Sequence, residues 1–281
     1  MKSVISASRR TDLVAFHASW LAGALAGGRA EVLGPRGRTR TVDLRPESVH
    51  TVVLWSKDFA PLIEDRHGLR SALGRYDQAY FLFTITGLGG TPVERGAPPR
   101  ETALAQLPAL VAIAGDPRRV SLRFDPIFAW REGPSIRSNL PFFGTLAAEA
   151  SRRGIEDIRF SFAQRYARAD RRIRRGGIEF VDPSEDEKIE SAHRLAETAA
   201  AFGLRLFSCS QDFLARVPGI GRSSCIDGAL LSSLHPRGER AAAAKDGSQR
   251  AECGCTRSED IGSYRQACPH RCLYCYANPE A

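Results

Sequence analysis

The residues of this 281-residue sequence best suited to chemistry are its seven cysteines, all of which lie after residue 208. An odd number of cysteines gathered near one end of a chain does not fit a framework of paired disulfides, whereas it is typical of metal binding. Three of them, Cys268, Cys272 and Cys275, form the motif C-x-x-x-C-x-x-C. The other four are Cys209, Cys225, Cys253 and Cys255. We therefore expect metal chemistry in the C-terminal part of the chain.

The C-x-x-x-C-x-x-C motif places three thiolates on one short loop. Three thiolates can bind three irons of a [4Fe-4S] cube and leave the fourth iron open to a small ligand. A shell made only of cysteines favours iron–sulfur clusters or zinc over hard cations. A closed zinc site would need a fourth ligand, which His270 could supply from within the loop. We expect the [4Fe-4S] cluster here, and zinc is the alternative.

The remaining four cysteines match the number of ligands that completes a zinc site or a second iron–sulfur cluster. Cys253 and Cys255 flank Gly254, which permits a sharp bend that brings two thiolates close together. We expect a second four-cysteine metal site, more readily a second [4Fe-4S] cluster than zinc, that also attaches the tail to the rest of the protein. In the alternative interpretation, Cys209 and Cys225 are small buried apolar residues.

The chain up to residue 208 alternates strand-like and helix-like segments. The predicted strands cover residues 3–6, 51–55, 80–86, 120–124, 157–162 and 204–208, and the helical patterns cover 13–26, 60–73, 101–114, 139–153 and 184–202. This alternation predicts an α/β fold with a parallel sheet and helices outside it. No glycine-rich nucleotide-binding motif follows the first strand. We therefore expect a partial TIM-like barrel of about six β/α units over residues 1–208, with an irregular, Cys-rich segment over 209–281 packed on its mouth.

Polar residues follow several of these strands, where parallel α/β folds gather their reactive groups. Those that we expect to act on substrate or cofactor are Arg9, Arg10, Asp12, Lys57, Arg123 and Asp125. Lys57 is distinctive because lysine is rare among the 40 basic residues of this chain. Arg123 lies within an apolar strand, so its charge requires a carboxylate such as Asp125 or Asp12, or a ligand anion. The alternative is that these residues are polar because strand ends are exposed.

The composition places the chain among ordinary globular proteins. It has 43% hydrophobic and 26% charged residues, which excludes a disordered or collagen-like chain. No apolar run is long enough to span a membrane, and the first ten residues lack the apolar core of a signal peptide. We therefore expect a cytoplasmic protein without membrane contact. The net charge of +8 and the arginine run at 165–175 leave an alternative function, a zinc-stabilised, non-enzymatic barrel that binds nucleic acid.

The cysteine motif, with Tyr274 before its last cysteine, resembles the cluster motif of radical S-adenosylmethionine enzymes, whose core is a six-unit β/α barrel. Further segments resemble, over nearly the whole chain, a bacterial family designated domain of unknown function 1848. They are S-x-S-R-R-T-D, W-S-K-D, R-F-D-P-I, C-G-C and C-P-H-R-C-L-Y-C-Y-A-N. In radical S-adenosylmethionine enzymes the motif usually follows the first strand, whereas here it lies near the C-terminal end. In a barrel the last strand lies near the first, so a tail leaving the last strand reaches the same mouth.

The resemblance implies an enzyme that binds S-adenosylmethionine at the open iron of a [4Fe-4S] cluster and cleaves it reductively to a 5′-deoxyadenosyl radical. The implied cluster ligands are Cys268, Cys272 and Cys275, and the residues lining the cofactor are Tyr274 and Tyr276. The basic strand-end residues would bind a carboxylate or phosphate of cofactor or substrate, with Asp12 and Asp125 orienting them. A reductant such as flavodoxin or ferredoxin would supply the electron, and the substrate would be a small molecule or a macromolecule.

Overall fold

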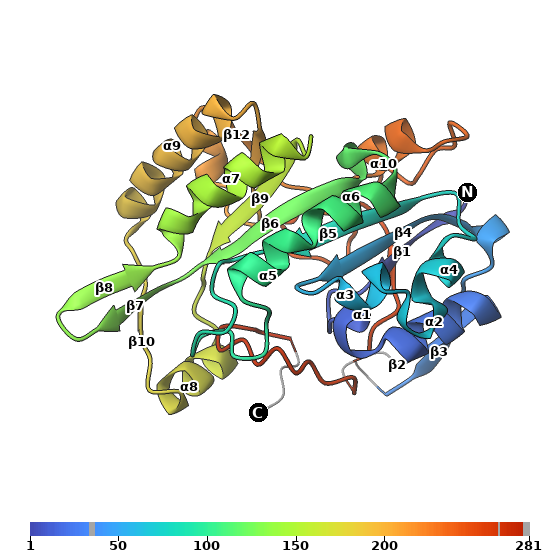
Figure 1. The fold of residues 1–281 in the computed structure, drawn as a ribbon, viewed down its shortest axis with the longest axis horizontal. Coiled ribbons are helices and arrows are strands. Elements are labelled where there is room, and N and C mark those ends of the chain that lie inside the picture. Colours follow the sequence, from blue (N-terminus) through green and yellow to red (C-terminus); the bar gives the residue numbers. More distant parts are fainter. Residues whose placement is uncertain (34–36, 264, 278–281) are drawn as a thin grey trace.

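The computed structural model describes residues 1–33, 37–263 and 265–277 and has an eight-stranded sheet at its centre (Figure 1). The strands are ordered β12-β11-β9-β6-β5-β4-β1-β13, and every neighbouring pair is parallel. They are β1 (Ser3–Ala7), β4 (Val49–Ser56), β5 (Ala79–Thr84), β6 (Val120–Ile127), β9 (Asp157–Phe162), β11 (Arg205–Ser208), β12 (Ile220–Arg222) and β13 (Glu259–Asp260). The expected α/β class and parallel sheet are confirmed.

The order of the strands follows the chain from β1 to β12, but the sheet does not close into a barrel. β12 lies at one edge and β13 at the other, and among the described residues no ladder joins the two. Both strands come from beyond residue 208, and β13 pairs with β1. The prediction of a TIM-like barrel is therefore not confirmed. The sheet is open, and it takes in two strands of the segment that was expected to be irregular.

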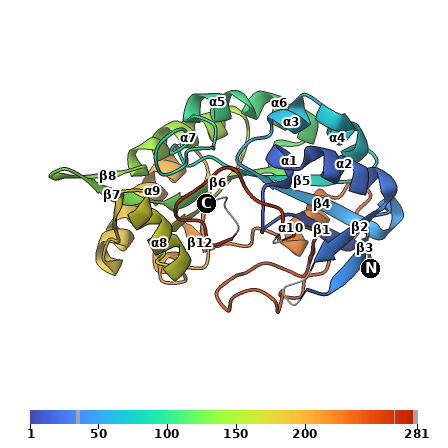
Figure 2. The same ribbon diagram turned by 90° about the horizontal axis from the view of Figure 1, so that it is seen from below.

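Different parts of the chain cover the two faces of this sheet. Because side chains alternate across a strand, Val52 and Leu54 of β4 pack into the large core beneath the helices. Val53 and Trp55 of the same strand point the other way and pack with Leu231 and other residues of the C-terminal segment. Figure 2 shows helices α1 to α6 on one side of the sheet and the C-terminal loops (orange) on the other. The tail therefore covers the second face of the sheet at β1, β4 and β5, as a parallel sheet buried on both faces requires.

The helices are shorter than their sequence patterns. In the described part of the chain they are α1 (Leu13–Phe16), α2 (Ala18–Gly27), α3 (Ala60–Ile63), α4 (Leu69–Leu73), α5 (Arg100–Ala105), α6 (Leu107–Ala114), α7 (Phe143–Arg152), α8 (Ala167–Arg175), α9 (Glu185–Ala201) and α10 (Gly228–Leu234). The pattern at 13–26 is interrupted at His17. The pattern at 101–114 is interrupted at Gln106, because Pro108 lacks the N–H needed to continue a helix. None of the described helices is long and apolar enough to cross a membrane.

Two antiparallel additions lie outside the main sheet and were missing from the sequence prediction. β2 (Arg29–Leu33) pairs with β3 (Thr39–Asp43), and β7 (Ala129–Glu132) pairs with β8 (Ser135–Ser138) and β10 (Glu179–Val181). These strands are short and carry many exposed polar residues. Their sequences do not show a clear apolar stripe, because packing against neighbouring strands determines where such short strands form.

The motif loop, residues 268–275, is joined to the loop after β5 by backbone hydrogen bonds. The Gly96 N–H donates to the His270 carbonyl oxygen at 3.0 Å, and the Leu273 N–H donates to the Val93 carbonyl oxygen at 3.0 Å. Such pairing fixes the loop along its length, as in an antiparallel ladder. The C-terminal motif is therefore held at the carboxyl ends of the strands by residues that precede it by more than half the chain.

The Asp260 carboxylate at the end of β13 attaches this part of the tail to β1 and to the loop after β1. That carboxylate accepts hydrogen bonds from the hydroxyl groups of Ser6 and Ser8, both at 2.9 Å. It also accepts from the backbone N–H groups of Arg9 at 2.8 Å and Gly262 at 3.0 Å. Hydrogen bonds to a charged acceptor are among the stronger ones in proteins. Asp260 therefore secures the tail to the first strand just before the chain enters the motif loop.

Replacement of Gly96 by alanine tests the docking of the motif loop. A Cβ at position 96 would lie 2.1 Å from the Pro269 carbonyl oxygen, so the backbone of one loop must move. We expect Gly96→Ala to lower the free energy of unfolding by about 1–3 kcal/mol, the usual cost of overpacking. Chemical denaturation would measure it. The matched control is Gly23→Ala in α2, where a Cβ meets nothing within 4 Å, and a gain of about 0.5–1 kcal/mol is expected. Equal stability of the two variants would contradict the prediction.

Candidate functional site

A cavity of about 480 Å³ opens at the carboxyl ends of the parallel strands. Residues that follow β1, β4, β6 and β9 line it together with residues of the C-terminal segment. All seven cysteines contribute to this lining. So do the other residues that the sequence singled out, which are Arg9, Arg10, Asp12, Lys57, Arg123, Asp125, Tyr274 and Tyr276. The cavity has the size typical of small-molecule sites, about 300–1,000 Å³.

The three motif cysteines lie against the loops that follow β1, β4 and β5. Cys272 is buried, and Cys268 and Cys275 are partly buried. Burial raises the pKa of the Cys272 thiol well above its usual value, and the nearby Glu94 carboxylate raises it further. Burial, aided by the Asp12 carboxylate, raises the pKa of Cys268 to about 12. Free thiols in these positions hold their protons at neutral pH, so a metal that binds there must displace them.

Among the described residues, no three or more His, Cys, Asp or Glu side chains are gathered closely enough to hold one metal ion as they stand. A [4Fe-4S] cluster gives each cysteine a separate iron, and the cluster and a zinc ion stay the two expectations for the motif loop.

The imidazole of His270 connects the motif loop to the loop after β1. Its Nε2 atom lies 2.8 Å from Asp12 Oδ2, and its Nδ1 atom lies 3.1 Å from the Gly96 carbonyl oxygen. Asp12 also accepts hydrogen bonds from the Ser56 hydroxyl and the Lys57 backbone N–H, both at 2.9 Å. Both ring nitrogens of His270 are thus engaged within the protein. Asp12 links the motif loop to the ends of β1 and β4, and its expected role in orienting basic side chains stays a prediction.

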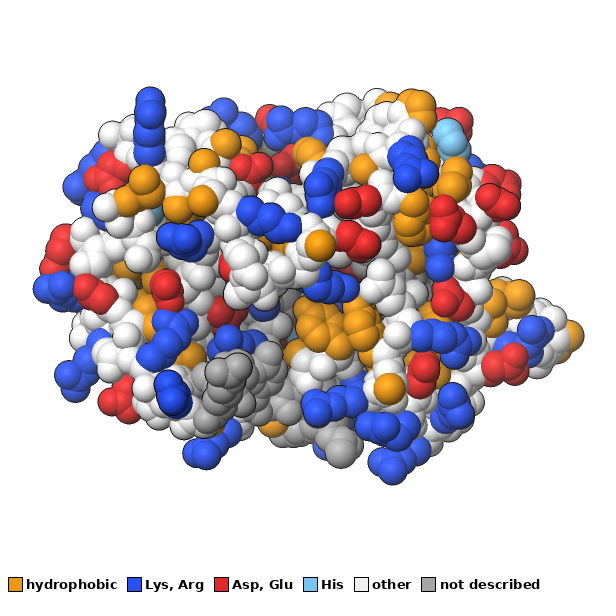
Figure 3. Space-filling model, turned by 180° about the vertical axis from the view of Figure 1, so that it is seen from behind, with side chains coloured by type: hydrophobic (Ala, Val, Ile, Leu, Met, Phe, Trp, Pro, Cys, Tyr) orange, Lys and Arg blue, Asp and Glu red, His pale blue; other side chains and the backbone are white. Residues whose placement is uncertain are grey.

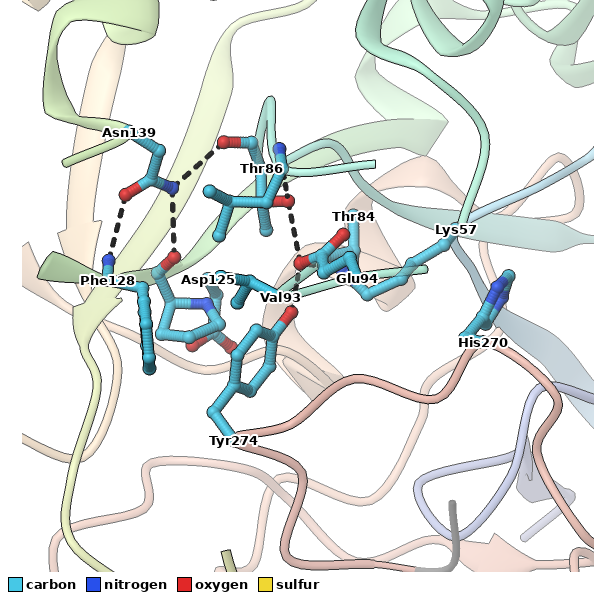
Figure 4. Close-up of polar contacts among 12 residues, drawn as sticks. Lys57, Thr84, Thr86, Val93, Glu94, Asp125, Phe128, Asn139, His270 and Tyr274 are labelled. Atoms are coloured by element: carbon cyan, nitrogen blue, oxygen red, sulfur yellow. Dashed lines mark hydrogen bonds and ion pairs between the residues drawn. The ribbon is translucent and has the colours of Figure 1, made fainter. Parts of the chain in front are cut away.

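A buried carboxylate, that of Glu94, connects Lys57 with Tyr274 (Figure 4). The Lys57 Nζ atom lies 3.0 Å from Glu94 Oε1, and the Thr86 hydroxyl donates to the same oxygen at 2.7 Å. The Tyr274 hydroxyl donates to it as well. Burial disfavours the charge of Lys57, but Glu94 outweighs that effect and the pKa of Lys57 is raised. Glu94 escaped the sequence analysis because it lies in a loop without motif or periodicity.

Two arginines, Arg9 and Arg123, line the cavity next to the ring of Trp55. Arg123 on β6 donates to Asp125, the carboxylate that the sequence offered as its partner, and to the Thr84 hydroxyl at 3.2 Å. The guanidinium groups of Arg9 and Arg123 lie 5.2 and 5.1 Å from the Trp55 ring centre. Arg9 Nη2 and Arg123 Nε are buried and have no hydrogen-bond partner among the described residues. These N–H groups are donors suited to an anionic ligand.

The other four cysteines line the cavity near the ends of β11 and β12. Cys209 follows β11, Cys225 follows β12, and Cys253 and Cys255 precede β13. The thiol of Cys225 interacts with those of Cys209 and Cys255, and Cys255 interacts in turn with Cys253. The structure therefore brings together the four cysteines that the sequence analysis had grouped only by subtraction.

The two tyrosines expected to line a cofactor occupy different settings. Tyr274 is held by Glu94, and its ring lies 5.9 Å from the Phe128 ring. Tyr276 is 56% exposed, and its ring lies 5.5 Å from that of Tyr166. The Tyr166 hydroxyl accepts a hydrogen bond from Arg250 at 2.8 Å. Tyr274 is thus fixed deep in the cavity, whereas Tyr276 lies at its open rim.

The arginine run at 165–175 contains the whole of helix α8, but its side chains do not all face solvent. Arg168 and Arg171 are exposed, whereas Arg172 is partly buried and interacts with the thiols of Cys275 and Cys272. Burial lowers the pKa of Arg172. Figure 3 shows the face opposite to that of Figure 1, where Lys and Arg side chains are interspersed with Asp and Glu. One arginine of this run therefore belongs to the surroundings of the motif cysteines.

Comparison with known proteins gives a match over nearly the whole chain. The family model described as Domain of unknown function (DUF1848) matches residues 4–277. The match includes the first strand, the strand-end residues and all seven cysteines. Among curated proteins no match to the chain is found.

Substitution of Glu94 tests whether its carboxylate holds this wall of the cavity together. Glu94→Gln keeps the shape but leaves the buried Lys57 charge without its partner, so we expect a loss of about 3–5 kcal/mol in the free energy of unfolding. The double variant Lys57→Met/Glu94→Gln should lose less than the two single variants combined. Glu132→Gln is the control, because the Glu132–Arg137 pair is exposed and should contribute at most about 1 kcal/mol. Denaturant unfolding would measure the wild type and the four variants, and an equal effect of the Glu94 and Glu132 changes would refute the prediction.

Proposed function

This chain belongs to the DUF1848 family, and from that premise we propose that it is an iron–sulfur enzyme of the radical S-adenosylmethionine type. It would cleave S-adenosylmethionine reductively, with an electron from a reductant such as flavodoxin or ferredoxin, and act on a substrate in the same cavity. One observation carries the proposal: the motif cysteines share a cavity with buried arginine N–H groups that have no partner among the described residues.

The surroundings of the motif loop fit a [4Fe-4S] cluster with one open iron. The loop offers three thiols, and both ring nitrogens of His270 are engaged within the protein. The charges of Lys57 and Arg172 act on the Cys272 thiol and would offset the negative charge of a cluster. When bound and reduced, such a cluster supplies the electron that splits S-adenosylmethionine into methionine and a 5′-deoxyadenosyl radical.

The remaining lining fits an anionic group of a cofactor or substrate. The basic residues that line the cavity are Arg9, Arg10, Lys57, Arg123 and Arg250, and the acidic ones are Asp12 and Asp125. The unpartnered N–H groups of Arg9 and Arg123 can each donate to a carboxylate, and hydrogen bonds between charged groups are the strong ones. The rings of Tyr274 and Tyr276 also line the cavity and offer surfaces on which a flat base can stack. These features support binding of S-adenosylmethionine, which has both a carboxylate and an adenine.

The residues of the chain would contribute mainly by positioning. Glu94 fixes the Tyr274 hydroxyl and the Lys57 ammonium on one wall. The contact between Asp12 and His270 fixes the motif loop relative to the strand ends. A ligand that bridges the motif loop and the arginines would therefore be held in one orientation, and such pre-organisation lowers the barrier of a reaction that needs exact placement.

Replacement of Cys272 tests the proposed activity. The anaerobically purified and reduced wild type should contain iron and sulfide, show an electron paramagnetic resonance signal that changes with S-adenosylmethionine, and release 5′-deoxyadenosine. In Cys272→Ala the signal change and the release should fall to background, because the cluster loses one of its three ligands. Ser191→Ala, a buried serine on α9 remote from the cavity lining, is the control and should behave like the wild type.

Two results would contradict the proposed function. In one, Cys272→Ala retains the cluster and the turnover of S-adenosylmethionine. In the other, the wild type contains zinc and no sulfide, which would favour the zinc-stabilised binding protein. That alternative requires affinity for nucleic acid that falls steeply with salt concentration, and a titration at two ionic strengths would establish it.

A further inference from the structure

We infer that Cys209, Cys225, Cys253 and Cys255 bind a second [4Fe-4S] cluster, one in which every iron has a cysteine ligand. These four residues, the four-cysteine site, are separate from the motif loop. The site is built from the ends of β11 and β12 and from the segment before β13, whereas the motif loop lies against the loops after β1, β4 and β5. The inference is independent of the reaction proposed above.

The backbone around the four-cysteine site is arranged to hold the thiols side by side. The Cys209 N–H donates to the Phe160 carbonyl oxygen at 2.8 Å, which fixes Cys209 at the end of β11. The Ile226 N–H donates to the Cys255 sulfur atom at 3.4 Å. Backbone N–H groups directed at cysteine sulfur atoms are a feature that tunes iron–sulfur sites. None of the four is in a disulfide, although the thiols interact in sequence along the group.

Gly254 allows the approach of the two segments that carry these thiols. A Cβ at this position would lie 2.6 Å from the Ser223 carbonyl oxygen, and the Ser224 hydroxyl donates to the Gly254 carbonyl oxygen at 2.7 Å. The backbone of Gly254 does not have the positive φ that a glycine-dependent bend would require. The glycine between the two cysteines therefore serves close packing, whereas the sequence analysis had assigned it to a sharp bend.

The charge around the four-cysteine site is the second line of support. The guanidinium groups of Arg9, Arg123 and Arg159 each interact with the Cys225 thiol. Arg159 is 3% exposed, and its ion pair with Asp157 is long, at 3.7 Å. Buried cations are costly unless anions accompany them. Four neutral thiols supply no such charge, whereas a [4Fe-4S] cluster with four thiolate ligands carries net negative charge.

The four thiols line one cavity and interact with one another in sequence. A [4Fe-4S] cube has a separate iron for each of four thiolates, so the number of cysteines gathered here is the number that completes it. Because all four irons would have cysteine ligands, the cluster would secure the tail to the sheet and hold an electron without binding substrate directly.

The test compares iron and acid-labile sulfide in full-length proteins reconstituted anaerobically with ferrous iron and sulfide. The wild type should contain about eight irons per chain if both sites are filled. The triple variant Cys268→Ala/Cys272→Ala/Cys275→Ala leaves the four-cysteine site intact and should keep about four irons and about four sulfides. Its electron paramagnetic resonance signal should not respond to S-adenosylmethionine. Cys225→Ala should lose this signal, whereas Ser191→Ala, a buried serine on α9 outside the cavity lining, should retain it.

The outcomes separate this inference from the proposed function. If the motif loop binds no cluster, the wild type and the triple variant both hold about four irons, and the four-cysteine site stands without the proposed reaction. If the triple variant holds no iron, or holds zinc without sulfide, the inference is wrong. It is also wrong if Cys225→Ala keeps the iron content and the electron paramagnetic resonance signal of the wild type. Because the triple variant leaves all four cysteines in place, a folding defect of Cys225→Ala does not remove the test.

Discussion

The contact between His270 and Asp12, at 2.8 Å across 258 residues of sequence, is the interaction on which the candidate site depends. Asp12 is 7% exposed and His270 is 3% exposed, so the contact pairs polar atoms of two buried side chains. Asp12 also accepts hydrogen bonds from the Ala15 N–H at the start of α1 and from Ser56 at the end of β4. One carboxylate thus joins the first helix, the second strand of the main sheet and the motif loop. A shift of any of these elements would move the motif cysteines relative to the arginines.

This contact is possible because the C-terminal segment covers the inner face of an open sheet. In a closed barrel that face is filled by the side chains of the strands themselves. Here Val53 and Trp55 pack instead with α10 and with Cys225 and Cys255 of the tail. The same apolar burial that stabilises the sheet therefore brings cysteines to the cavity. The site therefore forms when the tail folds onto the sheet, so the close packing of the motif loop at Gly96 affects both.

The cavity is lined both by buried cationic side chains and by thiols, and the two together determine its charge. Arg123 has a carboxylate partner in Asp125, whereas Arg9 lies against Trp55 and the tail with one buried N–H unpartnered among the described residues. Thiols that lose their protons on binding metal would supply the missing negative charge. Lys57 is different, because Glu94 neutralises it within the protein. The charges near Glu94 are thus balanced within the protein, whereas the part of the cavity lined by Arg9 and Arg123 is suited to an added anionic group.

The sequence by itself determined the parallel α/β class, the grouping of the cysteines and the strand-end residues, because apolar runs, glycine stops and residue spacing are local signals. It also determined that Arg123 needs a carboxylate, since a charge within an apolar strand cannot stay unpaired. Only the tertiary structure decided that the sheet stays open, that His270 contacts Asp12, and that Glu94 holds Lys57. Each of these depends on contacts between segments far apart in the sequence. Backbone pairing and desolvation act across such contacts, and no local sequence pattern indicates them.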